Sequence, residues 1–260
     1  MGEIQAGIYE RLITAGFEAD LAAVAADLIQ RERLDAGDAD AALAGHVADL
    51  AGRALRSVPE RASGSALDRL RRQVELTNTI VTAIIDAAPS ANTTDDLVAD
   101  GELLTEVIAA PSTPAAPRPA ERPTVPLSTS ALLVNGRDQP RIGSEVQKEL
   151  ASADRVDLLC AFVMWHGLRV IEEQIAELTR RRRLAGETAP PLRVITTTYV
   201  GATERRALDR LVELGAEVKV SYETRMTRLH AKAWLFHRDS GYSTAYVGSS
   251  NLSKAALVDG

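Results

Sequence analysis

The sequence of 260 residues lacks the features that mark exported, disulfide-bonded or membrane-spanning proteins. Cys160 is its single cysteine, which excludes an intrachain disulfide, and its place inside the apolar run 156–162 predicts a small buried side chain. The first residues lack the basic and then apolar order of a secretory signal, and no apolar run approaches the roughly 20 residues that cross a bilayer. We therefore expect a cytoplasmic protein with no membrane partner.

Lysine is also scarce, with four lysines against 26 arginines, and charge is divided unevenly along the chain. Residues 1–127 hold 11 Lys and Arg against 20 Asp and Glu, a net charge of −9, whereas residues 128–260 hold 19 against 16, a net charge of +3. This asymmetry suggests two parts with different partners, of which the second is better suited to attract an anion.

The front of the chain reads as helical. Apolar residues recur at helical spacing over residues 21–29, 43–55 and 67–84, and no alternation typical of strands is present there. Gly64 and Ser65 supply a start for the last of these helices, and Pro89 supplies a stop. We expect a small all-helical bundle domain over residues 1–108.

Proline then marks a boundary. Six prolines fall among Ala, Ser, Thr and Arg over residues 109–130, which predicts an extended Pro-rich linker. In residues 131–260, apolar segments typical of strands alternate with segments of helical spacing. This order predicts an α/β domain in which a mixed sheet is flanked by helices. The expected strands are 156–162, 192–198, 216–221, 230–237 and 244–248. The expected helices are 144–153, 167–182, 203–214 and a short one from Leu252.

The chemistry is concentrated near the end of the chain. On a strand over 230–237, the side chains of His230 and Lys232 lie on one face, because side chains two apart share a face. A histidine can attack phosphorus if positive charge is supplied for the equatorial oxygens, and a neighbouring lysine supplies it. After the next strand, Ser249 and Asn251 offer neutral hydrogen bonds to a phosphate. Gly248, which permits a close backbone approach, and Ser250 are expected substrate contacts of the same turn.

These residues resemble the phospholipase D superfamily, whose pattern is His-x-Lys, four residues, Asp, and then Gly-Ser-x-Asn after a short gap. The resemblance covers roughly residues 130–260 and implies a phospholipase-D-like fold. It also implies a two-step reaction through a phosphohistidine, with no metal and no cofactor. By this resemblance His230 is the nucleophile, Lys232 and Asn251 hold the phosphate, and Ser249 supports them. Because superfamily members bring two motifs together, one motif in this chain implies a homodimer.

Two departures from the family pattern bear on the activity. The position of the family's Asp holds His237, so the usual partner that orients the nucleophilic histidine is missing. The sequence also ends at Gly260, soon after Asn251, which we interpret as a C-terminally incomplete domain. The segments around His230 and Ser249 are similar to a narrower group of bacterial proteins in which such a domain precedes a superfamily II helicase, so a helicase domain beyond residue 260 is an expected partner.

Three functions remain open. We expect a phosphodiesterase directed at DNA, in which Thr198 and Tyr199, at the end of an expected strand, also contact substrate. A hydrolase of lipid or other phosphodiesters in the same superfamily is the first alternative. The second is a catalytically weakened module that binds nucleic acid or organises an assembly, which the missing Asp and the single motif favour. Incubation with DNA and with phosphatidylcholine would discriminate between the three.

Overall fold

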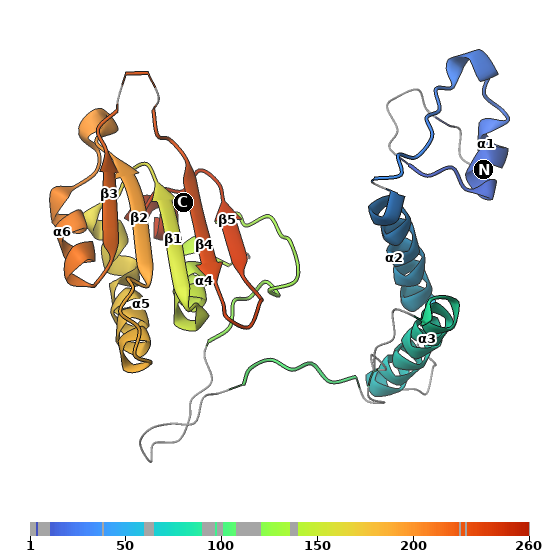
Figure 1. The fold of residues 1–260 in the computed structure, drawn as a ribbon, viewed down its shortest axis with the longest axis horizontal. Helices are drawn as coiled ribbons and strands as arrows, with labels where there is room; N and C mark the ends of the chain where they lie inside the picture. The colour runs from blue at the N-terminus through green and yellow to red at the C-terminus, as the bar shows by residue number, and fades with distance from the viewer. Residues whose placement is uncertain are drawn as a thin grey trace. The chain divides into compact units, whose positions relative to one another are not determined.

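A computed structural model describes residues 4, 11–37, 39–59, 65–89, 97, 101–107, 121–135, 140–223, 225–226 and 228–259. The chain divides into two compact units, Met1–Val107 and Ile108–Gly260 (Figure 1). No helix within these described ranges is long and apolar enough to cross a membrane.

The described elements of the first unit are all helical. They are α1 (Ala15–Leu21), the 3-10 turn η1 (Ala26–Leu28), α2 (Ala39–Ser57) and α3 (Ala66–Ala87). The start predicted for α3 is confirmed, because the Ser65 hydroxyl accepts a hydrogen bond from the backbone N–H of Asp68 while the Asp68 carboxylate accepts one from the N–H of Ser65. Gln73 of α3 donates to the carbonyl of Leu55, which ties α3 to α2.

The helix expected over residues 21–29 is wrong. Thr14 caps α1 by accepting a hydrogen bond from the N–H of Phe17, so the helix begins earlier and ends at Leu21. Beyond this end the side chain of Leu28 is 74% exposed and Val24 and Ile29 are only half-buried, so the described residues do not cover the apolar stripe that the spacing suggested. Without a surface to pack on, a short helix gains little from its apolar face.

The second unit contains a mixed five-stranded sheet in the order β3-β2-β1-β4-β5, which agrees with the predicted α/β class (Figure 1). Strand β1 pairs with β2, and β2 with β3, in parallel; β4 is antiparallel to β1 and to β5. The strands are β1 (Arg155–Cys160), β2 (Leu192–Thr197), β3 (Glu217–Ser221), β4 (Lys232–His237) and β5 (Thr244–Val247). The helices are α4 (Ile142–Ser152), α5 (Trp165–Leu184) and α6 (Arg205–Glu213), with a 3-10 turn η3 (Tyr199–Gly201) and a π-helical turn η4 (Ala255–Asp259).

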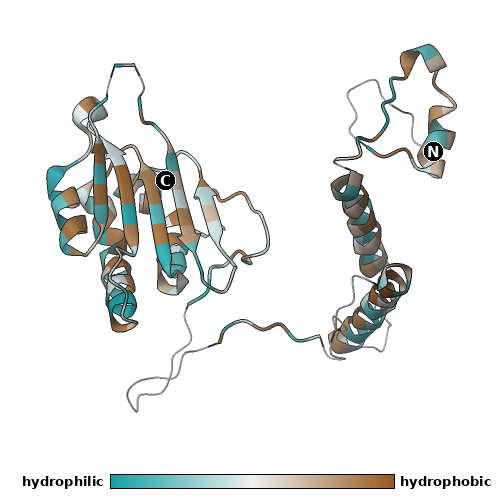
Figure 2. Cartoon of the chain, in the orientation of Figure 1, coloured by the Kyte–Doolittle hydropathy of each residue, from teal (hydrophilic) through white to brown (hydrophobic). Residues whose placement is uncertain are grey.

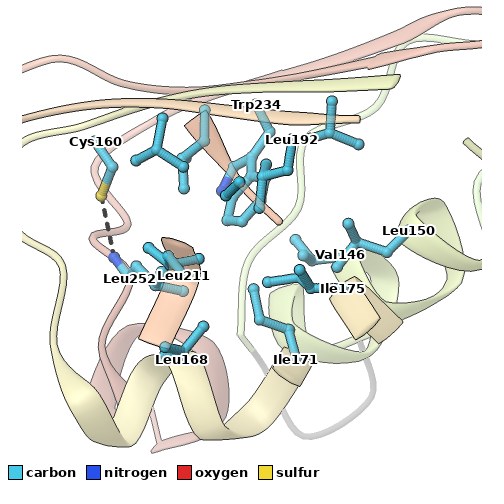
Figure 3. Packing of buried hydrophobic residues seen from close by; sticks show 14 of the residues in the cluster. Val146, Leu150, Cys160, Leu168, Ile171, Ile175, Leu192, Leu211, Trp234 and Leu252 are labelled. Atoms are coloured by element: carbon cyan, nitrogen blue, oxygen red, sulfur yellow. Dashed lines mark hydrogen bonds between the residues drawn. The ribbon is translucent and has the colours of Figure 1, made fainter. Parts of the chain in front are cut away.

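One face of this sheet carries the core. Alternate residues of β1, β2 and β4 are buried against α4, α5 and α6, and Trp234 and Leu192 point into the same cluster as Leu150 and Ile175 (Figure 3). Apolar and polar residues accordingly alternate along the strands in Figure 2. Cys160 is 1% exposed inside this cluster, as its apolar surroundings predicted.

The strand register brings several chain segments to one edge of the sheet. Cys160, the last residue of β1, lies opposite Lys232, the first residue of β4. Val247, the last residue of β5, lies opposite Ala233. The ends of the parallel strands β1 and β2, the start of β4 and the end of β5 therefore share this edge, the site edge. Sites in open α/β sheets commonly lie beyond the carboxyl ends of the parallel strands.

Residues 121–130, the last part of the predicted Pro-rich linker, belong to the second unit and contact its helix α4. The backbone N–H and hydroxyl of Thr124 each donate to the carboxylate of Glu145 on α4, at 2.7 Å. Glu145 is fully buried and also accepts from Lys148. Burial opposes its ionisation, but the hydrogen bonds from Thr124 and Lys148 prevail and lower the pKa of Glu145. Residues 108–120, with most of the prolines, lie outside the described residues.

Candidate phosphodiester site at the sheet edge

His230 and Lys232 are in contact. The ammonium Nζ of Lys232 lies 3.0 Å from each ring nitrogen of His230 and 2.7 Å from the His230 carbonyl oxygen, to which it donates. His230 precedes β4 rather than belonging to it, which corrects the predicted strand start at residue 230. Its ring is exposed, whereas Lys232 is 7% exposed and points to the core side of the sheet. An exposed imidazole beside a buried cation suits attack on an anionic substrate.

The turn after β5 lies against Lys232. The backbone N–H of Gly248 donates to the carbonyl of Lys232 at 3.2 Å, so Ser249 and Ser250 follow directly at the site edge. A cavity of about 750 Å³ opens here, and Lys232, Gly248, Ser249 and Ser250 are among the residues that line it. A Cβ built at Gly248 meets no atom within 4 Å, so packing of the chain does not require glycine at this position.

Asn251 is connected to Lys232 through Cys160. The backbone N–H of Leu252 donates to the Cys160 sulfur at 3.2 Å and to the carbonyl of Phe162 at 3.2 Å, and Cys160 is the register partner of Lys232 (Figure 3). Burial raises the pKa of the Cys160 thiol, so this residue serves as a packed hydrogen-bonding link. The buried Oδ1 of Asn251 has no hydrogen-bond partner in the described part of the chain, which is the type of orphaned atom that a ligand can satisfy.

The other predicted contacts follow the end of strand β2. Thr198 follows β2, its side chain is exposed, and its N–H donates to the carbonyl of Ser221. Tyr199 is half-buried, and its backbone N–H donates to the hydroxyl of Thr197. Both therefore lie at the site edge. The lining of the 750 Å³ cavity includes neither of them, nor His230 and Asn251, so the predicted residues share an edge of the sheet without all opening into one cavity.

His237 lies away from this group. It is the last residue of β4, on the sheet face opposite to Lys232, and its Nε2 lies 2.9 Å from the carboxylate of Asp157. Arg193 holds that carboxylate from β2 with two hydrogen bonds of 2.5 and 2.8 Å. These bonds from Arg193, with help from His237 and against partial burial, lower the pKa of Asp157.

Sequence reasoning missed two residues of the site edge, Phe162 and Arg228. The ring of Phe162 lies with its centroid 5.9 Å from that of His230, and Lys232 Nζ is also 5.9 Å from its centroid. Arg228 Nη1 donates to the hydroxyl of Tyr199 at 3.2 Å. Phe162 ends the run expected to form the first strand, so its position at a carboxyl strand end was a signal that could have found it. Arg228 gave no such signal.

Within the described residues, no group of three or more His, Cys, Asp or Glu lies close enough together to hold a metal ion. The chain matches no protein-family model, and none of the curated proteins matches it significantly. The motif and the geometry of the site edge are therefore the features that point to an activity.

Proposed function

We propose that the chain is a phospholipase-D-like phosphodiesterase that cleaves DNA through a phosphohistidine intermediate. The observation that carries the proposal is the 3.0 Å contact between Lys232 Nζ and the ring nitrogens of His230, next to the turn that presents Ser249 and Asn251. A nucleophile with a cation beside it and neutral donors on the adjacent turn matches what attack on a phosphodiester requires.

The reaction proceeds in two displacements. A ring nitrogen of His230 attacks phosphorus, an N–P bond forms, and the bond from phosphorus to the leaving oxygen breaks. Lys232, Ser249 and Asn251 stabilise the charge on the other phosphate oxygens. Water then attacks phosphorus, which breaks the N–P bond, releases a phosphomonoester and returns the imidazole.

The leaving oxygen needs a proton, and we propose that a second copy of the chain supplies it. His237 cannot serve in the same copy, because it lies on the other sheet face at the far end of β4. The second copy's own motif would provide the acid, as the resemblance to two-motif enzymes implies. A DNA-processing or phage-defence protein with a helicase partner, in the cytoplasm, is the setting we propose for such a dimer.

A second candidate function is binding of nucleic acid without cleavage. It is favoured by one observation: among the described residues, no carboxylate contacts the ring of His230, whose hydrogen-bond partner is the ammonium of Lys232. A nucleophilic histidine without an orienting carboxylate is less well positioned for attack.

The test uses the full chain and its His230→Asn variant with labelled DNA, in excess EDTA. We expect cleavage by the wild-type chain, a covalent protein–DNA adduct trapped by rapid denaturation at alkaline pH, where the N–P bond is stable, and a loss of rate of about three orders of magnitude in the variant. Cleavage that survives in the variant overturns the proposal. Binding without cleavage selects the second candidate, and choline release from phosphatidylcholine vesicles selects a lipid hydrolase. Light scattering measures whether the active species is a dimer.

A further inference from the structure

Three side chains from distant segments form a row along the site edge. Phe162 follows β1, Tyr199 follows β2 and Arg228 precedes β4. The rings of Phe162 and Tyr199 are nearly parallel, at an interplanar angle of 22° with centroids 6.5 Å apart. The guanidinium of Arg228 lies 5.2 Å from the centroid of Tyr199. We call Phe162, Tyr199 and Arg228 the aromatic row.

The aromatic row is not part of the hydrophobic core. Neither Phe162 nor Tyr199 belongs to the buried cluster between the sheet and the helices, both rings are half-buried, and Arg228 is exposed. The backbone beside Tyr199 is also strained, because Val200 adopts a φ of 54°, which a β-branched residue rarely takes. With only three phenylalanines and five tyrosines in the chain, two aromatic rings held at the site edge and outside the core call for a role other than packing.

The row begins at the proposed nucleophile. The centroid of Phe162 is 5.9 Å from that of His230, and the two rings meet edge to face at 71°. A nucleotide whose phosphate lies at His230 and Lys232 carries its base within reach of this row. Aromatic side chains and arginine planes stack on nucleobases, whereas a lipid headgroup offers no flat ring to stack. In a duplex the bases are paired and stacked inside, so an unpaired strand alone can present them to an aromatic surface.

We infer that the aromatic row of Phe162, Tyr199 and Arg228 stacks unpaired bases and makes single-stranded nucleic acid the substrate of this site. This inference rests on the proposed function for the phosphate position, but it makes a separate claim about the bases. The two rings provide the stacking surface, and Arg228 contributes a planar cation that can stack on a base or contact the next phosphate.

A comparison of normal and abasic oligonucleotides isolates the bases from the phosphates. Binding is measured by fluorescence anisotropy with the His230→Asn chain, which prevents turnover, on a single-stranded oligothymidylate, an abasic strand of equal length, and a duplex. We expect the oligothymidylate to bind about tenfold more tightly than the abasic strand, because each stacked base contributes strongly to affinity. The duplex is expected to bind no better than the abasic strand.

Further substitutions in the same background assign this preference to the row. Phe162→Leu, which keeps apolar bulk, and Tyr199→Ala should each reduce the ratio of the affinity for oligothymidylate to the affinity for the abasic strand. In the double variant this ratio should be close to one. Tyr242→Ala is the matched control, because Tyr242 is 59% exposed in the turn between β4 and β5, at the opposite edge of the sheet, and the ratio should not change. Thermal unfolding followed by circular dichroism checks that each variant is folded.

Equal affinity for the oligothymidylate and the abasic strand overturns the inference, as does a preference that survives in the folded double variant. The outcome is separable from that of the proposed function. If the chain prefers strands that carry bases but cleaves no phosphodiester, base stacking by the aromatic row is supported and the nuclease activity is refuted. If the wild-type chain cleaves DNA but shows no base preference, the nuclease activity is supported and base stacking by the aromatic row is refuted.

Discussion

His237 Nε2 lies 2.9 Å from Oδ2 of Asp157, on the face of the sheet opposite to Lys232. His237 ends β4 and Lys232 begins it, so the two are about 17 Å apart along the strand at about 3.3 Å per residue. The residue that stands in the place of the family's Asp is therefore part of a cross-strand polar group with Asp157 and Arg193. It contributes to the sheet and not to the orientation of His230.

Substitution of His237 is expected to affect stability and leave any cleavage intact. His237→Asp, which introduces the Asp of the phospholipase D pattern, should place a second carboxylate beside Asp157 and lower the free energy of unfolding by roughly 0.5–1 kcal/mol. It should not increase the cleavage rate, because the new carboxylate remains far from His230. Cleavage assays and urea unfolding of the variant measure both effects, and a large gain in rate would show that the strand end reaches the site.

Asp157 should make the stability of the second unit sensitive to acid. Arg193 and His237 hold its pKa below the ordinary value of about 3.9, so its stabilising effect is complete above that value and is lost as the pH falls through the lowered pKa. Compared with Asp157→Asn, the wild-type chain should be more stable by about 1 kcal/mol near pH 6, since the Arg193 contact is bidentate and only partly exposed. The difference should shrink below about pH 4.

Tryptophan fluorescence suits this measurement, because Trp165 and Trp234 are the two tryptophans of the chain and both lie in the second unit. Urea unfolding at a series of pH values then reports on that unit alone. A wild-type advantage that grows on acidification would contradict the assignment of the pKa shift.

The local sequence pattern predicted most strands and helices of the second unit, because these elements are short and regular. The burial of Val156, Leu158 and Cys160 in β1 follows from the apolar run at 156–162 and from the helices that cover one face of the sheet. Contacts that depend on the register of distant segments could not be predicted in this way. Phe162 and Tyr199 are 37 positions apart, and no periodicity indicates that β1 and β2 end side by side.

The relation between Asn251 and Lys232 could be predicted in part. The motif predicted that both belong to one site, and the structure relates them through Cys160, whose sulfur accepts from Leu252 and whose register partner is Lys232. The sequence predicted Cys160 as buried but gave no indication of this link, because it depends on the parallel bridge between Val163 and Leu252.

Arg238 should be among the most sensitive positions for stability. It forms a buried ion pair with Glu149, and the same carboxylate accepts hydrogen bonds from Thr244 and Tyr246 at 2.8 and 2.9 Å. Arg238→Met leaves the carboxylate of Glu149, which is 1% exposed, without its cation, and should lower the free energy of unfolding by about 3 kcal/mol or more.

Two further variants check that this loss comes from the unpaired charge. Lys219→Met removes an exposed ion pair with Glu217 and should change stability by less than about 0.5 kcal/mol. Adding Glu149→Gln to Arg238→Met should recover part of the loss, because the remaining buried group is then neutral. Equal losses for Lys219→Met and Arg238→Met would refute this explanation.

Gly167 lets α5 approach the turn that carries Asn251. A Cβ at this position would lie 2.3 Å from the carbonyl oxygen of Leu252 and 2.5 Å from the backbone nitrogen of Ser253, so α5 or the turn must move. In an ordinary helix Gly→Ala stabilises by roughly 0.5–1 kcal/mol, but here overpacking should reverse the sign and cost roughly 1–3 kcal/mol. The displaced Asn251 should also reduce any phosphodiester cleavage by tenfold or more, at temperatures where the variant is folded.

Gly248→Ala is the matched control for Gly167→Ala, because a Cβ at Gly248 meets no atom within 4 Å. Its free energy of unfolding should equal that of the wild-type chain within about 0.5 kcal/mol. Cleavage by this variant then reports whether a substrate phosphate approaches the backbone at Gly248 closely enough to exclude a methyl group. If Gly167→Ala proves as stable and as active as the wild-type chain, α5 does not hold the Asn251 turn in place, and the connection between helix packing and the site is lost.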